Sequence, residues 1–84
     1  MKFYTHISEE SHILEYLQSR QLLFQYKRAK QKLLSWYSWK LDLKERKPKG
    51  CGIFSFRINQ QFRAFCIEEG DALIVFEISN HQNF

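Results

Sequence analysis

The sequence contains few of the residues that interrupt or cross-link a chain. Its 84 residues include three glycines, one proline and two cysteines, and neither Gly nor Pro occurs in residues 1–47. Two cysteines cannot form a disulfide framework, and no C-x-x-C or H-x-x-x-H pair of the kind that binds zinc is present. We therefore expect reduced thiols, no metal and no cofactor, and a reducing environment such as the cytoplasm.

Long apolar runs are also missing. No stretch approaches the ~20 apolar residues needed to span a bilayer, and Glu9 and Glu10 interrupt the N-terminal segment before an apolar signal-peptide core could form. We therefore expect neither a signal peptide nor a membrane partner. The length corresponds to one domain, residues 1–84, and the aromatic fraction of 17% would help so short a chain fill a core.

The charge balance is moderately basic. Thirteen Lys and Arg residues against nine Asp and Glu residues give a net charge of +4. This excess favours an anionic partner, either nucleic acid or an acidic protein segment, without choosing between them.

The first half of the sequence predicts one strand and two helices. Residues 2–7 alternate and are rich in aromatic and β-branched side chains, which favours a strand. Ser8 is expected to cap a helix that ends near Ser19–Gln21. A second helix is expected over Leu22–Tyr37, with apolar side chains at helical spacing. Its other positions include Lys27, Arg28, Lys30 and Lys32, which form either a solvated face or a surface for an RNA backbone or acidic partner.

Residues 38–52 are expected to form a basic connector. Pro48, Gly50 and Gly52 prevent a helix from continuing through it. The segment is either a solvated loop or a source of cations at the edge of the following sheet. Its charged residues include Lys40, Lys44, Glu45, Arg46, Lys47 and Lys49.

The last third, residues 52–84, predicts three antiparallel strands joined by three-residue loops at Asn59–Gln61 and Glu68–Gly70. Period-two alternation then divides the side chains between two faces. One face is apolar and comprises Phe54, Phe56, Ile58, Phe62, Ala64, Cys66, Ala72, Ile74, Phe76 and Ile78. The other carries Ser55, Arg57, Arg63, Glu77, Ser79 and His81, with Phe65, Ile67, Leu73 and Val75 toward its far end.

These elements predict a two-layer α+β domain of order β-α-α-β-β-β. The helical hairpin must cover the apolar face of the antiparallel sheet, because no other element is available to bury it. Trp36 and Trp39 are expected to pack in the core, and the N-terminal strand is expected to join the sheet as an edge.

Two segments carry a resemblance to a known family. The chain resembles the RelE/ParE toxin superfamily of type II toxin–antitoxin systems in the stretches KGCGIFSFRINQQFRAF and VFEISNHQNF, which are closest to the RelE, HigB and YoeB branches. The capping segment SEES, the basic connector and the EEGD turn add to this resemblance. The resemblance extends along nearly the whole chain. It implies a small toxin that a cognate antitoxin keeps silent, and many members cleave mRNA in the ribosomal A site without a metal.

The polar face suits that chemistry. Metal-free RNA cleavage requires deprotonation of a 2′-hydroxyl, stabilisation of charge on the phosphorane and protonation of the leaving oxygen. Arg57 and Arg63 fit charge stabilisation because an arginine stays protonated, and both have counterparts in the family pattern. His81 suits general acid or base catalysis, and either Glu77 or Glu45 could act as the base or orient a partner. For RNA binding we expect Lys44, Lys47, Lys49 and Phe84.

The sequence departs from the family pattern at its last residue. Many nucleolytic members carry a tyrosine near the C-terminus, whereas this chain has Phe84, which can stack on a base but cannot transfer a proton. Two alternatives to a nuclease therefore stay open. One is a ParE-like toxin that binds and poisons a topoisomerase, and the other is an inactive homologue that still binds an antitoxin.

Overall fold

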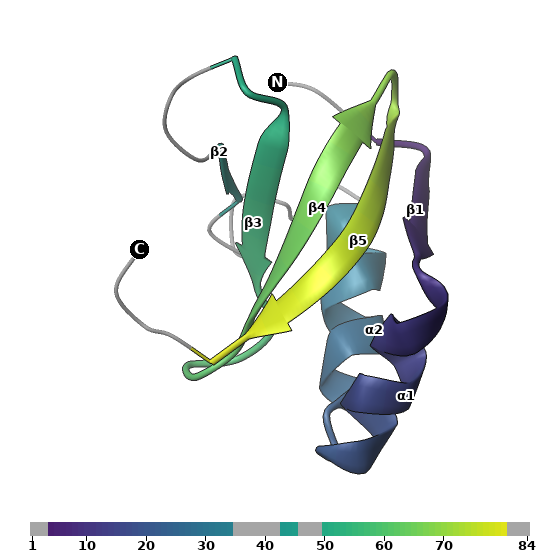
Figure 1. The fold of residues 1–84 in the computed structure, drawn as a ribbon, viewed down its shortest axis with the longest axis vertical. Coiled ribbons are helices and arrows are strands. Elements are labelled where there is room, and N and C mark those ends of the chain that lie inside the picture. Colours follow the sequence, from purple (N-terminus) through teal and green to yellow (C-terminus); the bar gives the residue numbers. More distant parts are fainter. Residues whose placement is uncertain (1–3, 35–42, 46–49, 81–84) are drawn as a thin grey trace.

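The computed structural model describes residues 4–34, 43–45 and 50–80, and these form one five-stranded sheet with two helices on one face (Figure 1). The sheet order is β1-β5-β4-β3-β2. The predicted α+β architecture, with a helical hairpin on a sheet, is confirmed. The predicted order β-α-α-β-β-β lacked the short strand between α2 and β3, and the sheet is antiparallel except for its β1–β5 pair. The elements are β1 (His6–Glu9), α1 (Ser11–Ser19), α2 (Leu23–Leu33), β2 (Lys44–Glu45), β3 (Ile53–Arg57), β4 (Arg63–Glu69) and β5 (Ala72–Ser79).

The first strand lies at a sheet edge, as expected, and runs parallel to β5. It continues further than the sequence suggested, because Ser8 and Glu9 pair with Ile74 and Val75 of β5. The amide of Glu10 also donates to the carbonyl of Val75 at 3.0 Å. The prediction that Ser8 caps the first helix is therefore wrong: strand pairing takes these residues, and α1 begins at Ser11.

The break between the helices lies where it was expected. Gln21 has a φ of 59°, and the amide of Leu22 bonds back to the carbonyl of Leu17 at 2.8 Å. The helix α2 then presents Tyr26, Ala29 and Leu33 to the core at helical spacing. The expected continuation of this helix to Tyr37, together with Trp36 and Trp39, lies outside the described residues.

The β3–β4 hairpin has the predicted register. Arg57 pairs with Arg63, and Ile53 pairs with Ile67. The loop is closed by Asn59, whose side-chain oxygen accepts the amides of Gln61 and Phe62, each at 2.8 Å. The side chains of β3 and β4 therefore divide between the two faces as the alternation indicated.

The β4–β5 hairpin differs from the prediction. Glu68 and Glu69 belong to β4, and Glu69 pairs with Ala72 across a turn at residues 70–71. Gly70 still supplies the left-handed residue, with a φ of 60°. The register shifts once along the hairpin, between the pair of Cys66 with Val75 and the pair of Phe65 with Glu77. This β-bulge leaves Phe76 as the extra residue of β5.

The bulge reverses the faces of the first half of β5. Leu73 and Val75 are completely buried in the core, whereas the sequence placed them on the polar face. Ile74, which was expected in the core, is register partner of Ile67 on the other face, and Ala72 and Phe76 are also outside the core cluster. After the bulge, Ile78 pairs with Ala64 and packs against the core as predicted.

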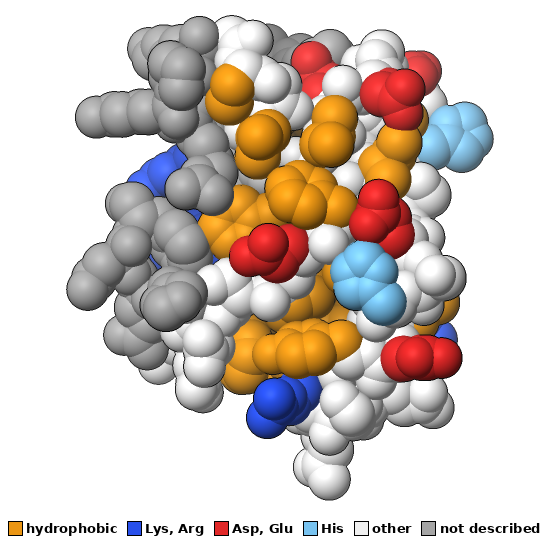
Figure 2. Space-filling view, in the orientation of Figure 1, with side chains coloured by type: hydrophobic (Ala, Val, Ile, Leu, Met, Phe, Trp, Pro, Cys, Tyr) orange, Lys and Arg blue, Asp and Glu red, His pale blue; other side chains and the backbone are white. Residues whose placement is uncertain are grey.

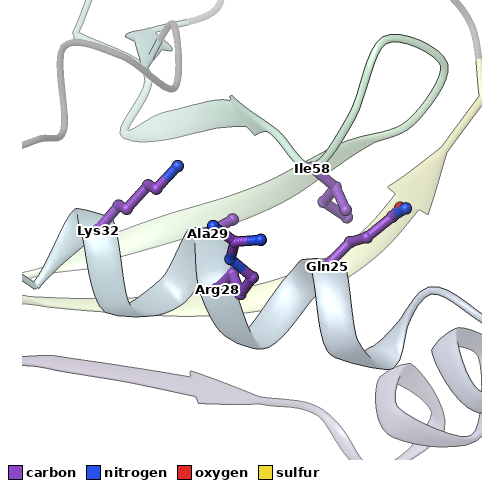
Figure 3. Close-up of a pocket in the computed structure, with 5 residues that line it drawn as sticks. All are labelled: Gln25, Arg28, Ala29, Lys32 and Ile58. Carbon is purple, nitrogen blue, oxygen red and sulfur yellow. The ribbon is translucent and has the colours of Figure 1, made fainter.

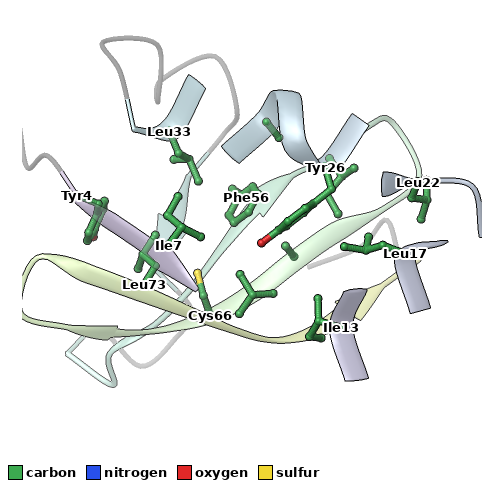
Figure 4. Packing of buried hydrophobic residues seen from close by; sticks show 14 residues of the cluster. Tyr4, Ile7, Ile13, Leu17, Leu22, Tyr26, Leu33, Phe56, Cys66 and Leu73 are labelled. Carbon is green, nitrogen blue, oxygen red and sulfur yellow. The ribbon is translucent and has the colours of Figure 1, made fainter. Parts of the chain in front are cut away.

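The core lies between the two helices and the sheet face that they cover (Figure 4). Tyr26 and Phe56 pack with ring centroids 6.3 Å apart. Cys66 is fully buried, and burial together with the nearby Glu68 carboxylate raises the pKa of its thiol to about 12. Cys51 is exposed, as its glycine-flanked position suggested.

One polar cluster ties the edge strand to the second helix. A single oxygen of Glu9 in β1 accepts the Tyr26 hydroxyl at 2.6 Å and the Lys30 ammonium at 2.8 Å. Burial and this bond raise the pKa of Tyr26 above its ordinary value. The carboxylate is thus paired and hydrogen-bonded, which is what a partly buried charge requires.

Candidate functional site

The sheet face that the helices do not cover, here called the open face, carries most of the described site residues. Register partners on neighbouring strands point to the same side, so the pairing defines rows across this face. One row contains Arg57, Arg63 and Ser79; the next contains Lys44, Ser55, Phe65 and Glu77; a third contains Ile53, Ile67 and Ile74.

Arg57 and Arg63, here called the arginine pair, are direct partners across β3 and β4. Like charges directly opposite each other in a sheet are destabilising. The arrangement concentrates two permanent positive charges at one end of the open face. Such a concentration is suited to binding an anion such as a phosphate.

Arg63 is held in place by Ser55 of the neighbouring strand. The Ser55 hydroxyl accepts bonds from Nε and Nη2 of Arg63 at 3.2 and 3.0 Å, and Nη2 also donates to the Ser55 carbonyl at 3.3 Å. Ser55 is only 4% exposed, while Arg63 is half-buried and Arg57 is exposed. The guanidinium of Arg63 is thus oriented before any ligand arrives.

Glu77 and Lys44 lie on the same face as the arginine pair. Glu77 follows the bulge on β5 and is exposed, two positions before Ser79, the register partner of Arg63. Lys44 lies at the β2 edge opposite Ser55. The structure therefore brings these two predicted residues to the face that carries the arginines.

Glu45 is not brought to that face. Its register partner is Phe54, which packs against the core, so Glu45 lies on the helix side of the sheet. Its carboxylate accepts the amides of Gly50 and Gly52 at 3.0 and 3.3 Å. In this position Glu45 fixes the end of the basic connector.

Four predicted site residues lie outside the described part of the chain. For His81, Lys47, Lys49 and Phe84 the roles in proton transfer and RNA binding stay predictions.

A histidine that the sequence did not single out lies beside β5. His12 at the start of α1 has its Nε2 3.1 Å from the carbonyl oxygen of Phe76, the bulged residue next to Glu77. Its Nδ1 lies 3.9 Å from the Glu10 carboxylate. His12 is brought beside β5 by the parallel pairing of β1 with β5, and no local sequence motif indicates that pairing.

The open face is less polar than the sequence suggested. Hydrophobic side chains spread across it between acidic and histidine side chains (Figure 2). The isoleucine row of Ile53, Ile67 and Ile74 crosses three strands, and Ile67 is 44% exposed. Ile74 joined this row through the bulge, so the row is a product of the register that the sequence did not predict.

In residues 4–34, 43–45 and 50–80, no three His, Cys, Asp or Glu side chains are grouped to hold a metal ion. Neither described helix is long and apolar enough to cross a membrane.

No protein-family model matches the sequence, and no curated protein sequence matches it. Solved structures of similar fold include the following two. A chain of the RelE–RelB complex from Pyrococcus horikoshii has a TM-score of 0.70 at 11% identity, over 95% of this chain and 96% of that chain. The YoeB dimer from Staphylococcus aureus has a TM-score of 0.66 at 12% identity, over 96% and 99% of the two chains. The chain therefore has the RelE-like fold that these structures share, along almost its entire length.

Proposed function

We propose that the protein is the toxin of a type II toxin–antitoxin pair and that it cleaves mRNA on the ribosome without a metal. The observation that carries this proposal is the arginine pair on the open face, with Arg63 oriented by Ser55. The RelE-like fold and the sequence resemblance support the same class of protein. The proposed substrate would place the protein in the cytoplasm.

The arginine pair would stabilise the charge that develops on the scissile phosphate. In the proposed reaction the 2′-oxygen loses its proton to a base and attacks the adjacent phosphorus. The bond to the 5′-oxygen then breaks, and that oxygen leaves with a proton from an acid, giving a 2′,3′-cyclic phosphate and a 5′-hydroxyl. Forked donors fixed before the reaction stabilise the phosphorane best, because they need no reorganisation.

Proton transfer would involve Glu77 and His81. Glu77 is the better carboxylate candidate, because it shares the open face with the arginine pair, whereas Glu45 lies on the helix side and accepts two loop amides. Lys44 lies at the edge of the same face and would contact the RNA backbone. We assign Lys47, Lys49 and Phe84 to the same RNA track, with Phe84 stacking on a base.

The silencing partner would be a cognate antitoxin. The Pyrococcus structure is a complex of RelE with RelB, which supports a protein partner for this chain as well. An acidic segment of that partner would fold onto the arginine pair and block its approach to RNA, because opposite charge favours such docking.

One observation favours a second candidate function. The isoleucine row gives the open face an apolar strip that metal-free phosphate chemistry does not need. Such a strip suits a protein partner, so a ParE-like toxin that binds a topoisomerase is the alternative.

Substitution of Arg63 tests the proposal. Arg63→Ala should lower ribosome-dependent mRNA cleavage by about 10²–10³-fold and relieve growth arrest, because it removes a fixed donor from the transition state. Arg63→Lys keeps the charge but loses the fork and should recover only part of the rate. Cleavage would be measured by primer extension on a reporter mRNA with purified ribosomes, and thermal melts would be recorded in parallel.

Arg20→Ala is the matched control, since Arg20 is exposed at the end of α1 and its guanidinium lies over the Tyr16 ring. It should leave cleavage unchanged. Undiminished cleavage by a folded Arg63→Ala protein would refute the nuclease assignment. Growth arrest without mRNA cleavage in the wild type would support the topoisomerase alternative.

A further inference from the structure

A basic hollow lies on the helix side of the sheet, between α2 and the end of β3 (Figure 3). Its volume is about 200 Å³, equivalent to about seven liquid waters at roughly 30 Å³ each. That is enough room for a phosphate group with its hydration. The basic hollow is lined by Gln25, Arg28, Ala29, Lys32 and Ile58.

The lining combines positive charge with a small apolar floor. Arg28 and Lys32 lie one turn apart on α2, Ala29 and Ile58 are buried, and none of the five lining residues is acidic. Gln25 is bonded to the β3–β4 loop, because its side-chain oxygen accepts a hydrogen bond from the side-chain Nδ2 of Asn59 at 2.7 Å. The hollow is therefore a recess with two cations among its lining residues.

An exposed aromatic ring lies beside the hollow. Phe24 is 71% exposed, and the Arg28 guanidinium lies 5.8 Å from its ring centroid. Surfaces that bind single-stranded nucleic acid combine a cationic groove with exposed aromatic rings and arginines. The hollow and Phe24 have this composition.

The basic hollow adjoins the arginine pair through the end of β3. Arg57 and Ile58 are consecutive, and consecutive strand residues point to opposite faces. Arg57 thus projects from the open face, while Ile58 lines the hollow. In the described part of the chain, the polar loop at Asn59–Gln61 follows directly after Ile58 and precedes Arg63, so an RNA strand that leaves the arginine pair over this loop would reach the hollow.

We propose that the basic hollow is a second phosphate-binding subsite, which holds the RNA strand after it has passed the arginine pair; this inference rests on the proposed function. A stable protein partner would need roughly 800 Å² of contact on each side, whereas one phosphodiester group needs only a recess of this size. The size and the charge of the hollow favour RNA over an acidic protein segment.

Binding of short and long RNA tests the inference. Oligouridylates of about 4 and about 16 nucleotides, which bracket the site sizes of single-strand-binding folds, would carry 2′-O-methyl groups so that they cannot be cleaved. Fluorescence anisotropy at several salt concentrations would give the affinity and its salt dependence. The variant is Arg28→Ala with Lys32→Ala, and Arg28→Ala alone serves if the double variant melts early, because Arg28 is exposed.

Loss of one phosphate contact should reduce the slope of log affinity against log salt concentration by about 0.7 for the long oligonucleotide. The slope for the short oligonucleotide should stay unchanged. The charge-matched control, Arg20→Ala with Lys27→Ala, removes two exposed cations outside the hollow and should change neither slope by as much. Arg57→Ala with Arg63→Ala should weaken binding of both oligonucleotides.

The outcomes separate this inference from the proposed function. If the hollow variant binds both lengths like the wild type while the arginine-pair variant weakens both, the subsite is refuted and the nuclease proposal stands. Equal weakening by the hollow variant and its control would show only general charge and would also refute the subsite. An arginine-pair variant that binds RNA and arrests growth normally would refute the proposed function. If the hollow variant loses binding of a poly-glutamate peptide but keeps the wild-type slope for the long RNA, the surface is a protein site and the inference is wrong.

Discussion

At the scale of single residues, the position of Arg63 depends on one buried hydroxyl. Ser55 accepts two of the guanidinium donors and lies between the arginine pair and the rest of the open face. An oriented guanidinium loses less side-chain entropy when it binds a phosphate than a mobile one does. We therefore assign Ser55 as a positioning residue for Arg63.

Ser55→Ala should lower the cleavage rate by about tenfold, equivalent to about 1.4 kcal/mol, because Arg63 keeps its charge but loses its orientation. The loss should be smaller than that of Arg63→Ala and should fall on kcat more than on KM. Ser55→Thr, which retains the hydroxyl, should restore part of the rate. If Ser55→Thr and Ser55→Ala are equally impaired while both remain folded, Ser55 does not act through its hydroxyl.

Cys66 makes the stability of the protein sensitive to alkaline pH. Its thiol pKa is raised to about 12 in the folded protein, first by burial and then by Glu68, while an unfolded cysteine titrates near ~8.5. The unfolded state therefore loses its proton first as the pH rises. The contribution of Cys66 is complete below about pH 8.5 and is lost as the pH approaches 12.

The free energy of unfolding, measured with urea, should fall above about pH 8.5 by up to about 1.4 kcal/mol per pH unit from this group. Tyr4 and Tyr26, whose pKa values are also raised by burial, should steepen the fall above about pH 10. Cys66→Ala should flatten the profile between about pH 8.5 and 10, and Cys51→Ala should not, because Cys51 is exposed. An unaltered profile in Cys66→Ala would contradict this account.

At the scale of elements, the bulge in β5 decides which side chains build the core. It places Leu73 and Val75 against the helices and leaves Ile74 on the open face. Two adjacent residues of almost the same size therefore have opposite environments. Their substitution reports directly on the register.

Leu73→Ala should cost about 2–5 kcal/mol, as expected for a large side chain removed from a packed core. Ile74→Ala should cost less than half as much, because Ile74 is only half-buried. Ile67→Ala, its partner on β4, should behave like Ile74→Ala. Urea titrations would measure the three costs, and a greater loss for Ile74→Ala than for Leu73→Ala would mean that the register is the one the sequence first suggested.

The sequence predicted those elements in which polar and apolar residues alternate. In β3 and β4, Ser55, Arg57 and Arg63 alternate with apolar side chains, so a one-residue slip would bury a charge and the register is determined locally. In β5, residues 72–76 are all apolar, so the alternation does not show which residues face the helices. Which of residues 72–76 face the helices is instead set by the pairing of Glu68 and Glu69 within β4 and by the bulge.

In the candidate site, too, the sequence predicted only those residues whose charge or alternation determines which face of the sheet they occupy. Arg57, Arg63 and Glu77 were assigned to one face because their charges exclude the core. Glu45 could not be placed, since its face depends on the two-residue strand β2, which has no signal in so charged a connector. The position of His12 beside Phe76 depends on a parallel pairing between segments far apart in the sequence.

At the scale of the whole molecule, the net charge of +4 is modest for a protein that must find RNA unaided. The described open face also carries the isoleucine row and Glu77 beside the arginine pair. Because the non-specific affinity for RNA rises with the number of phosphates neutralised, free RNA should be bound weakly. The ribosome would then supply the positioning that the protein lacks.

The purified protein should therefore cleave naked RNA slowly and ribosome-bound mRNA at least about 10²-fold faster, as expected when a positioned substrate replaces an encounter in solution. Gel analysis of one transcript, with and without purified ribosomes, would measure the ratio. Arg63→Ala provides the background rate. Equal turnover of the two substrates would contradict ribosome dependence.

The parallel pairing of β1 with β5 has a consequence for when the protein can fold. The bond from Thr5 to Asp71 joins residues 66 positions apart, and contacts so distant in sequence form late and slow folding. During synthesis, the helices emerge before the strands that they must cover. Their apolar faces therefore stay uncovered until β3, β4 and β5 have been made. The sheet closes only after β5 has left the ribosome, and a chain interrupted before Ala72 leaves Ile7 and the β1 edge without the strand that pairs with them. The nascent chain of a protein that would act on ribosomes thus becomes competent only after β5 has been made.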